Sequence, residues 1–254
     1  MTALNLVILG PAGSGKSTLT VVFGKWLHEE MGFRVCYVNL DPGAEHLPYE
    51  PDYDVRSIVT VRDVMRREML GPNGAIIRCM DILVERAKEV VNEINKLKAD
   101  FRLIDTPGQM EPFTFRRTGP ELISELLKTG SVINVFLVDP ELASSVSDLL
   151  VVELMGLVVQ LRLLAPTLIV LNKADKLKTS LDIDRLLTDL GYLVERLKTE
   201  VGGTISDLAL SLWNAFSQYL QSSRLVKVSA KMGEGLESLY DLIHEAFCVC
   251  GDLT

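Results

Sequence analysis

Gly10-Pro11-Ala12-Gly13-Ser14-Gly15-Lys16-Ser17 is a glycine-rich stretch that directly follows a short apolar run, Leu4 to Leu9. A segment with helical periodicity, Ser17 to Met31, comes next. A strand, a glycine-rich turn and a helix in this order predict a loop whose backbone N–H groups converge on a phosphate at the positive end of the helix dipole. The residues expected to bind a nucleotide in this loop are Gly10, Gly13, Ser14, Gly15, Lys16, Ser17 and Thr18.

Two side chains of this loop have expected roles of their own. Lys16 would place a positive charge between the β- and γ-phosphates, and the Ser17 hydroxyl would be a ligand of Mg²⁺. The alternative is a glycine-rich turn that contains a lysine by chance, and the flanking strand and helix disfavour it. The motif by itself does not distinguish ATP from GTP.

Apolar runs and helical segments alternate along most of the 254 residues. Arg34 to Leu40 is the second expected strand, and the helix that separates it from the first makes the two strands parallel. Further strands are expected at residues 101–104, 132–138, 167–171 and 225–228. The sequence therefore predicts an α/β protein with a three-layer P-loop NTPase fold, a mostly parallel sheet and a single domain over residues 1–254.

The alternation breaks in residues 42–98. Three prolines in the first ten positions of this segment mark an irregular loop. Helices are expected from Val61 to Met69 and from Met80 to Leu97. Residues 42–98 are therefore interpreted as a helical insertion in the nucleotide-binding core.

A second segment has the pattern of a base-reading loop, Asn172-Lys173-Ala174-Asp175, which follows an expected strand. The Asp175 carboxylate can accept hydrogen bonds from N1–H and the 2-amino group of guanine, whereas adenine would leave a buried Asp175 unpaired. Lys173 can lay its methylene stem over the purine face, and Asn172 is expected to tie this loop to the phosphate loop. The later segment Ser229-Ala230-Lys231 would present backbone N–H to the guanine O6. It is common on protein surfaces and gains weight only from its place in the order of motifs.

The segment Asp105-Thr106-Pro107-Gly108-Gln109 ends another expected strand. Its Gly108 N–H can face a γ-phosphate, and loss of that phosphate would release the loop. Asp105 would hold Mg²⁺ through water, and Gln109 would orient an attacking water. Asp41, at the end of the second strand, is a further candidate for the water or the metal. The alternatives are a solvated loop amide at Gln109 and an aspartate that merely starts a turn at Asp41.

The composition excludes several classes of protein. Apolar residues make up 48% and charged residues 24%, so the chain is not mainly disordered. The net charge of −8 argues against a general nucleic-acid coat, because neutralising phosphates needs a basic surface. No basic segment with a cleavage site opens the chain, so we expect a cytoplasmic protein.

The most apolar stretch runs from Leu149 to Ala165. It contains Glu153, Gln160 and Arg162, whereas a membrane span needs about 20 residues almost free of charge. We therefore expect no membrane span but a core helix, and a groove that accepts a client peptide is the alternative.

The C-terminal part is expected to be helical. Residues 181–220 are interpreted as two helices joined near 201–204, and a last helix is expected at 236–247. The four cysteines have no zinc-finger spacing. Cys248 and Cys250 either lie in an inert tail or bind a metal or oxidise.

Further stretches give the chain a resemblance to a known family. Gly71-Pro72-Asn73-Gly74 lies inside the insertion and is followed by Arg78-Cys79-Met80-Asp81. Asn39-Leu40-Asp41-Pro42 follows the second strand, and the pattern Tyr49-x-Pro51-x-x-Asp54-Val55-Arg56 comes after it. Over nearly its whole length the chain resembles the GPN-loop GTPases, a homodimeric branch of the SIMIBI class, and in its compactness their archaeal members.

The resemblance implies a homodimer that hydrolyses GTP to GDP and phosphate with Mg²⁺. Gly71, Pro72 and Asn73 would reach across the dimer and place Asn73 near the γ-phosphate and catalytic water of the partner subunit. Asp41, Asp105 and Gln109 would be the water-positioning and metal-linked residues, and Glu111 is a candidate supporting carboxylate.

Three alternatives stay open. The tripeptide can be a loop that only caps a helix. The protein can be a nucleotide-gated assembly factor or chaperone with slow turnover. A P-loop kinase is disfavoured because no arginine-rich lid for an acceptor is visible.

Overall fold

A central sheet organises the computed structural model, which describes residues 3–177, 182–200, 203–220 and 225–251. The seven strands of the sheet have the order β3-β2-β4-β1-β5-β6-β7, and the pairings between them are parallel. The strands are β1 (Leu4–Leu9), β2 (Val35–Asn39), β3 (Tyr53–Asp54), β4 (Phe101–Asp105), β5 (Val132–Val138), β6 (Thr167–Leu171) and β7 (Leu225–Lys227). The predicted α/β fold is confirmed.

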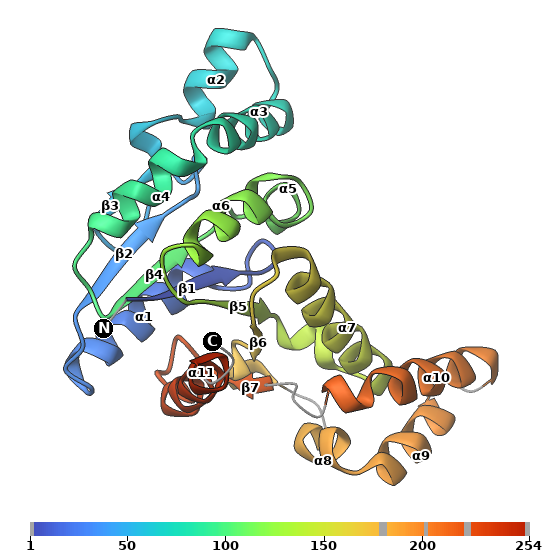
Figure 1. Ribbon diagram of the computed structural model, residues 1–254. Coiled ribbons are helices and arrows are strands. Elements are labelled where there is room, and N and C mark those ends of the chain that lie inside the picture. Colours follow the sequence, from blue (N-terminus) through green and yellow to red (C-terminus); the bar gives the residue numbers. More distant parts are fainter. Residues whose placement is uncertain (1–2, 178–181, 201–202, 221–224, 252–254) are drawn as a thin grey trace.

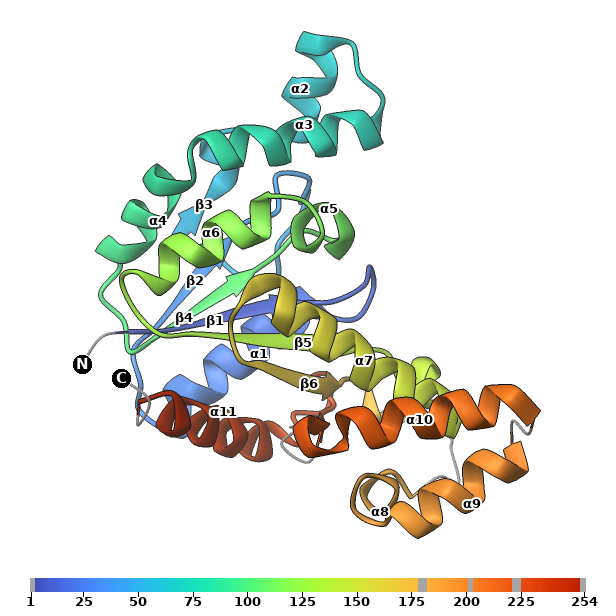
Figure 2. The same cartoon turned by 45° about the vertical axis from the view of Figure 1, so that its right-hand side comes forward.

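Helices cover both faces of this sheet and make three layers (Figures 1 and 2). One face carries α1 (Lys16–Glu29) and α11 (Leu236–Gly251), and the other carries, among others, α6 (Thr118–Leu127) and α7 (Val146–Leu163). Side chains of β1 alternate between the two layers: Leu6 and Ile8 belong to the core on the α1 side, and Val7 and Leu9 to the core on the other side. A parallel sheet buried on both faces explains why its strands are apolar at almost every position.

The carboxyl ends of the strands meet at one edge of the sheet. β1 pairs with β4 on one side and with β5 on the other. The strand order therefore reverses at β1: β2, β3 and β4 lie on one side of it, and β5, β6 and β7 on the other. Ligands bind outside the carboxyl ends at such a reversal of strand order. The loops that carry the predicted site residues follow β1, β2, β4, β6 and β7, and therefore emerge at this edge.

The insertion is helical, as predicted, but its helices begin and end elsewhere. The single helix expected at residues 80–97 is wrong: α3 (Pro72–Glu85) and α4 (Ala87–Lys96) are separated by Arg86, whose φ of −111° and ψ of 15° are not helical. α3 starts earlier because Pro72 suits the first helical position and Gly71 occupies the N-cap. The Gly71-Pro72-Asn73 tripeptide therefore begins α3, as the alternative of a helix-capping loop expected, and its reach across a dimer stays a prediction. α2 (Val61–Glu68) precedes it, and the two-residue edge strand β3 was not predicted.

Three helices follow β6 where two were expected. They are α8 (Ile183–Thr188), α9 (Leu190–Glu200) and α10 (Gly203–Leu220). α9 and α10 contact α7, and α8 packs against α9 (Figures 1 and 2). The additional boundary arises at Asp189, whose backbone is extended and whose side chain accepts the N–H of Tyr192, so that a new helix begins. Of the joint expected near residues 201–204, residues 201–202 lie outside the described residues, and α10 begins at Gly203.

The helix α7 begins near the predicted boundary and has a strong N-terminal cap. Ser145 accepts the N–H of Asp148, and the Asp148 side chain accepts the N–H of Ser145. Glu153 lies in its buried face. Within the part of the chain that the structure describes, no helix has both the length and the apolar character that a bilayer crossing requires.

The last helix, α11, extends further than predicted. It continues to Gly251, so Cys248 belongs to a helix rather than to a tail. Cys248 is exposed, and its Sγ lies 3.7 Å from Nδ1 of His244. The Cys250 side chain lies outside the described part of the chain.

Candidate functional site

The loop after β1 curls closely against its neighbours. Gly10 and Gly15 have φ angles of 152° and 95°, which favour glycine. A Cβ at Gly10 would collide with the carbonyl oxygen of Leu137, and one at Gly15 would lie 2.5 Å from Nδ2 of Asn172. Both positions therefore exclude any side chain, which explains the glycine spacing of the motif.

Lys16 joins this loop to the segment after β4. Its Nζ donates hydrogen bonds to the carbonyl oxygens of Gly10 at 2.8 Å, Pro11 at 3.1 Å and Gly108 at 2.9 Å. Burial lowers the pKa of Lys16, and the nearby carboxylates of Asp105 and Asp41 oppose that shift. The predicted phosphate-binding lysine is thus at the centre of the site, and it is surrounded by oxygen acceptors.

Asp41 holds the same segment from the other side. Its Oδ2 accepts the N–H of Gly108 at 3.0 Å, and its Oδ1 accepts the N–H of Gly43 at 2.8 Å. Oδ1 of Asn39 accepts the Asp41 N–H at 3.0 Å and fixes the turn. The N–H of Gly108, which we expected to face a γ-phosphate, is therefore bonded to Asp41 in this structure.

Asp105 is 2% exposed and lies at the end of β4. Burial raises its pKa from 3.8 to about 6, although the hydroxyls of Ser17 and Tyr49 and the charge of Lys16 act in the opposite direction. Oδ2 accepts the hydroxyl of Tyr49 at 2.9 Å, whereas Oδ1 is buried without a hydrogen-bond partner among the described residues.

The unpartnered oxygen of Asp105 suits the predicted metal. Mg²⁺ prefers oxygen ligands, keeps several waters and takes its remaining ligands from the phosphates of a substrate. The Ser17 hydroxyl and a water on Asp105 fit this pattern. No group of three or more His, Cys, Asp and Glu side chains forms a metal centre in the described ranges.

Tyr49 is a site residue whose role the sequence analysis did not predict. It lies in the loop between β2 and β3, and its ring packs 5.2 Å from the ring of Tyr37. Its hydroxyl donates to the buried Asp105 carboxylate. Tyr49 belongs to the sequence pattern around Pro51, but that pattern does not indicate the hydrogen bond to Asp105. The bond forms because the fold brings together two residues that are 56 positions apart.

The base-reading loop is tied to both neighbouring loops. Nδ2 of Asn172 donates to the carbonyl of Ser14 at 2.8 Å, which confirms the expected link to the phosphate loop. Oδ1 of Asn172 accepts the N–H of Ala230 at 3.2 Å. In this arrangement Asn172 engages the Ala230 N–H, and the expectation that residues 229–231 present a backbone N–H to the guanine O6 stays a prediction.

Asp175 is exposed in this structure, and not buried as expected for a carboxylate that discriminates guanine from adenine. Its Oδ1 accepts the hydroxyl of the fully buried Ser229 at 2.5 Å, and this hydrogen bond lowers the pKa of Asp175. Asp175 is thus ionised and fixed in orientation. Lys173 pairs with Asp139, with Nζ 2.6 Å from Oδ2, and Asp139 was not predicted.

The remaining predicted residues are exposed. Gln109 is the N-cap of α5 (Met110–Thr114), directly after Gly108, and Glu111 lies in the first turn of that helix. The other exposed members are Gly13, Thr18, Gly71, Pro72, Asn73 and Lys231. The start of α3 lies on the side of the molecule where the strands end, but beyond the phosphate loop (Figures 1 and 2).

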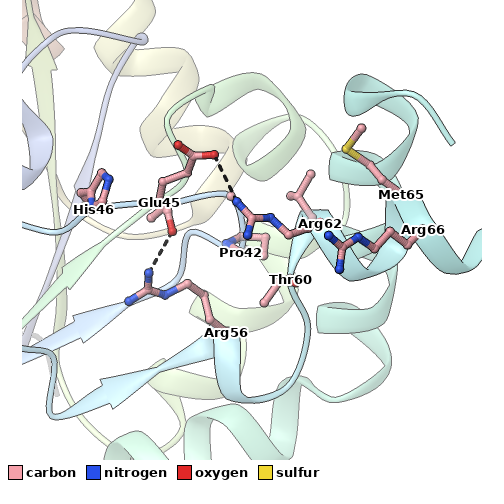
Figure 3. Close-up of a pocket in the computed structure, with 11 residues that line it drawn as sticks. Pro42, Glu45, His46, Arg56, Thr60, Arg62, Met65 and Arg66 are labelled. Carbon is pink, nitrogen blue, oxygen red and sulfur yellow. Dashed lines mark hydrogen bonds and ion pairs between the residues drawn. The ribbon is translucent and has the colours of Figure 1, made fainter.

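A pocket of about 710 Å³ adjoins the loop that follows Asp41 (Figure 3). Arginines line one part of it, but two of them are already engaged. Arg56 pairs with Asp54 and donates to the carbonyl of Ala44 at 2.9 Å, and Arg62 lies 3.8 Å from Glu45. These contacts brace the Asp41 loop.

Known proteins resemble this chain over most of its length. Residues 8–249 match the model of a family described as "Conserved hypothetical ATP binding protein". The chain is 41% identical over 254 residues to the GPN-loop GTPase PAB0955 of Pyrococcus abyssi, covering 98% of this chain and 99% of that one. It is 37% identical over 199 residues to GPN-loop GTPase 3 of Dictyostelium discoideum, covering 76% of this chain and 70% of the relative.

A solved structure extends the similarity to three dimensions. The apo form of the GTPase PAB0955 from Pyrococcus abyssi superposes with a TM-score of 0.85 at 39% sequence identity, and the match covers 98% of this chain and 100% of that one. The glycine-rich loop, the aspartate segment after β4 and the base-reading loop therefore occur within a match that spans almost the entire chain. This chain belongs to the family of GPN-loop GTPases.

Proposed function

We propose that this chain hydrolyses GTP to GDP and phosphate with Mg²⁺, and that it works as a homodimer in which each subunit completes the site of the other. The observation that carries the proposal is the double link made by Asn172. Its side chain joins the phosphate loop at Ser14 to the base-reading end of the site at Ala230. One side chain therefore fixes the spacing between the phosphate-binding and base-binding parts.

The printed description of the matching family names ATP, whereas the site favours guanine. Asp175 is an ionised acceptor held by Ser229, and guanine offers two donors, N1–H and the 2-amino group. Adenine offers neither at that edge, so it would cover the Asp175 carboxylate without supplying the two donors that guanine brings. We therefore assign GTP rather than ATP as the substrate.

Phosphoryl transfer needs positioning and charge stabilisation more than covalent chemistry. Lys16 supplies a buried positive charge, and the Gly108 N–H exchanges its bond with Asp41 for one with the γ-phosphate. Asp41, once released, and Gln109 orient the attacking water. Ser17 and, through water, Asp105 would hold Mg²⁺, which neutralises phosphate charge when it is bound.

The dimer is argued from the position of Asn73. Asn73 is exposed in the first turn of α3, and the structure does not bring it to Lys16 or Gly108 of its own subunit. The start of α3 lies on the side of the molecule where the strands end (Figure 2). A second copy that faces this edge would receive Asn73 beside its γ-phosphate.

Mixed dimers of two inactive variants test this proposal. Asn73→Ala is expected to bind GTP but hydrolyse it slowly, and Lys16→Ala is expected not to bind it. When the two are co-expressed, the mixed dimer has one complete site, because the Lys16→Ala subunit donates Asn73 to the intact phosphate loop of the other. About a quarter of the wild-type rate is then expected from an equal mixture. A mixture no more active than its separate components would contradict the shared site.

A second candidate function is nucleotide-gated binding of a client protein. α7 buries one face in the core but exposes three large apolar side chains, Val151, Val158 and Leu161, with exposed fractions of 52%, 47% and 65%. Its C-cap residue Leu164 is 78% exposed and adds a fourth. An apolar peptide that binds in one nucleotide state, and not to Leu161→Glu, would support this role. Equal binding of the peptide to the wild-type protein and to Leu161→Glu in every nucleotide state would contradict it.

The proposed compartment is the cytoplasm. Cys36, Cys79 and Cys248 are free thiols among the cysteines whose side chains the structure describes. Free thiols are usual in a reducing compartment.

A further inference from the structure

An ion pair joins the base-reading loop to the loop that follows β5. Nζ of Lys173 lies 2.6 Å from Oδ2 of Asp139, and both side chains are 31% exposed. Asp139 belongs to none of the motifs that identify the site. It contacts Lys173 only because β5 and β6 lie side by side in the sheet. It is therefore a residue whose role must be derived from the structure.

Asp139 is held firmly on its own side of the pair. Its Oδ1 accepts the N–H of Glu141 at 3.2 Å and caps the short helix η2 (Pro140–Ala143). β5 and β6 are paired up to Val138 and Leu171, and the N–H of Asn172 donates to the Val138 carbonyl at 3.0 Å. Both loops therefore leave the sheet from a fixed register, and the carboxylate has a fixed place beside the base-reading loop.

The charge of Asp139 is also secure. Partial burial acts to raise its pKa, but the hydrogen bonds from Lys173 and from the Glu141 N–H outweigh burial, so the pKa lies below its ordinary value. The carboxylate is thus ionised at neutral pH.

Lys173 is constrained at both ends. Its backbone has a φ of 58° and a ψ of 36°, a left-handed conformation that a lysine adopts rarely, and the helix η3 (Ala174–Lys176) starts directly after it. Its ammonium group is held by Asp139. The methylene stem is therefore stretched between two fixed points, whereas a lysine without a partner would lose side-chain entropy on taking one position.

We propose that Asp139 is a positioning residue for nucleotide binding: by holding the Lys173 ammonium group, it keeps the methylene stem in place as a wall against the purine face. The same bond keeps this ammonium group from turning toward the phosphates. The inference rests on the proposed binding of a guanine nucleotide. It adds a residue to the part of the site that contacts the face of the base, while Asp175 reads its edge.

This role has a defined signature. The wall touches the purine and not the γ-phosphate, so its loss must weaken GDP and GTP by the same factor. Losing the wall leaves the contacts of Asp175 with the edge of the base unchanged, so the ratio of GDP affinity to ADP affinity must not change. The rate of hydrolysis at saturating GTP must also stay as it is, because the reacting atoms are elsewhere.

Asp139→Asn is the variant that tests it. The amide oxygen of asparagine can still accept the Glu141 N–H and cap η2, but the charge that holds Lys173 is lost. We expect the Kd for a fluorescent GDP analogue to rise roughly threefold to tenfold, mainly through faster dissociation. The matched control is Asp100→Asn, which removes a carboxylate paired with Arg34 at the other end of the sheet and should leave the Kd unchanged.

A double-mutant cycle separates positioning from a merely structural effect. Lys173→Met keeps an apolar stem but has no ammonium group, so Asp139→Asn should have no further effect in that background. An unchanged Kd in Asp139→Asn would overturn the inference, and so would an equal loss with and without Lys173→Met. The same titrations also test the proposed function separately. If the wild-type protein bound ADP as tightly as GDP, the proposed GTPase function would fail, whatever Asp139→Asn does.

Discussion

Asp105 is a carboxylate whose ionised form the proposed chemistry needs and whose surroundings oppose that form. Burial raises its pKa to about 6, and one of its oxygens has no hydrogen-bond partner among the described residues. A hydrated cation beside that oxygen would give it a hydrogen-bond donor and would favour the ionised carboxylate. The residue therefore combines a stability penalty with a functional role, as active-site residues often do.

Asp105→Asn should separate the stability penalty of this carboxylate from its functional role. The folded-state pKa exceeds the ordinary 3.8, so the wild-type protein loses stability as the pH rises from about 4 to about 6, and the variant does not. Without Mg²⁺ and nucleotide, the variant should be more stable at pH 7.5 by at most about 3 kcal/mol, and the difference should vanish near pH 4. Denaturant unfolding at several pH values measures this. A variant that is less stable at pH 7.5 would contradict the account.

Asp175→Asn should change which base is read. The amide oxygen of the introduced asparagine can still accept N1–H, but its NH₂ group donates where guanine also donates. Xanthine has a carbonyl oxygen at that position, so the variant should bind GTP about 10- to 100-fold more weakly and gain affinity for xanthosine triphosphate. Competition binding of the two nucleotides measures the switch. A variant that loses GTP without gaining xanthosine triphosphate would show that Asp175 acts on the loop and not on the base.

At the scale of elements, local signals predicted the core and missed what depends on tertiary contact. β1, the glycine-rich loop and α1 follow from adjacent residues, and so do β4 to β7. The break at Arg86 and the two-residue strand β3 have no comparable local signal, because packing against neighbouring elements decides them.

The site divides in the same way. Lys16, Asp105 and Asn172 lie where their motifs placed them, because each motif is a short loop at the end of a strand. Tyr49 and Asp139 could not be predicted, since each acts through a partner 56 or 34 positions away in the chain.

The α7 cap provides a prediction at this scale. Ser145 and Asp148 satisfy each other's backbone N–H groups at the start of the helix. Ser145→Ala should lower the free energy of unfolding by about 1 kcal/mol, whereas Ser145→Thr, which keeps the hydroxyl, should stay close to the wild type. Thermal or denaturant unfolding measures both. Equal stability of Ser145→Ala and wild type would show that the cap contributes nothing.

At the scale of the whole molecule, one edge of the sheet gathers residues that are far apart in the chain. Loops that follow β1, β2, β4, β5, β6 and β7 meet there because these strands run in the same direction. The hydrogen bonds of Lys16, Asp41 and Asn172 connect loops that follow different strands. The protein has a net charge of −8, and a nucleoside triphosphate is also an anion, so the overall field opposes binding. Affinity for the nucleotide therefore depends on local groups such as Lys16 and the N–H donors of the loops.

Calorimetric titration of the wild-type protein with GTP and with ATP, each with Mg²⁺, tests the central claim most directly. Because Asp175 finds two donors on guanine and none on adenine, we predict that GTP binds at least about 100-fold more tightly than ATP. Equal affinity for the two nucleotides would contradict the assignment of the base-reading loop and the proposed GTPase function that depends on it.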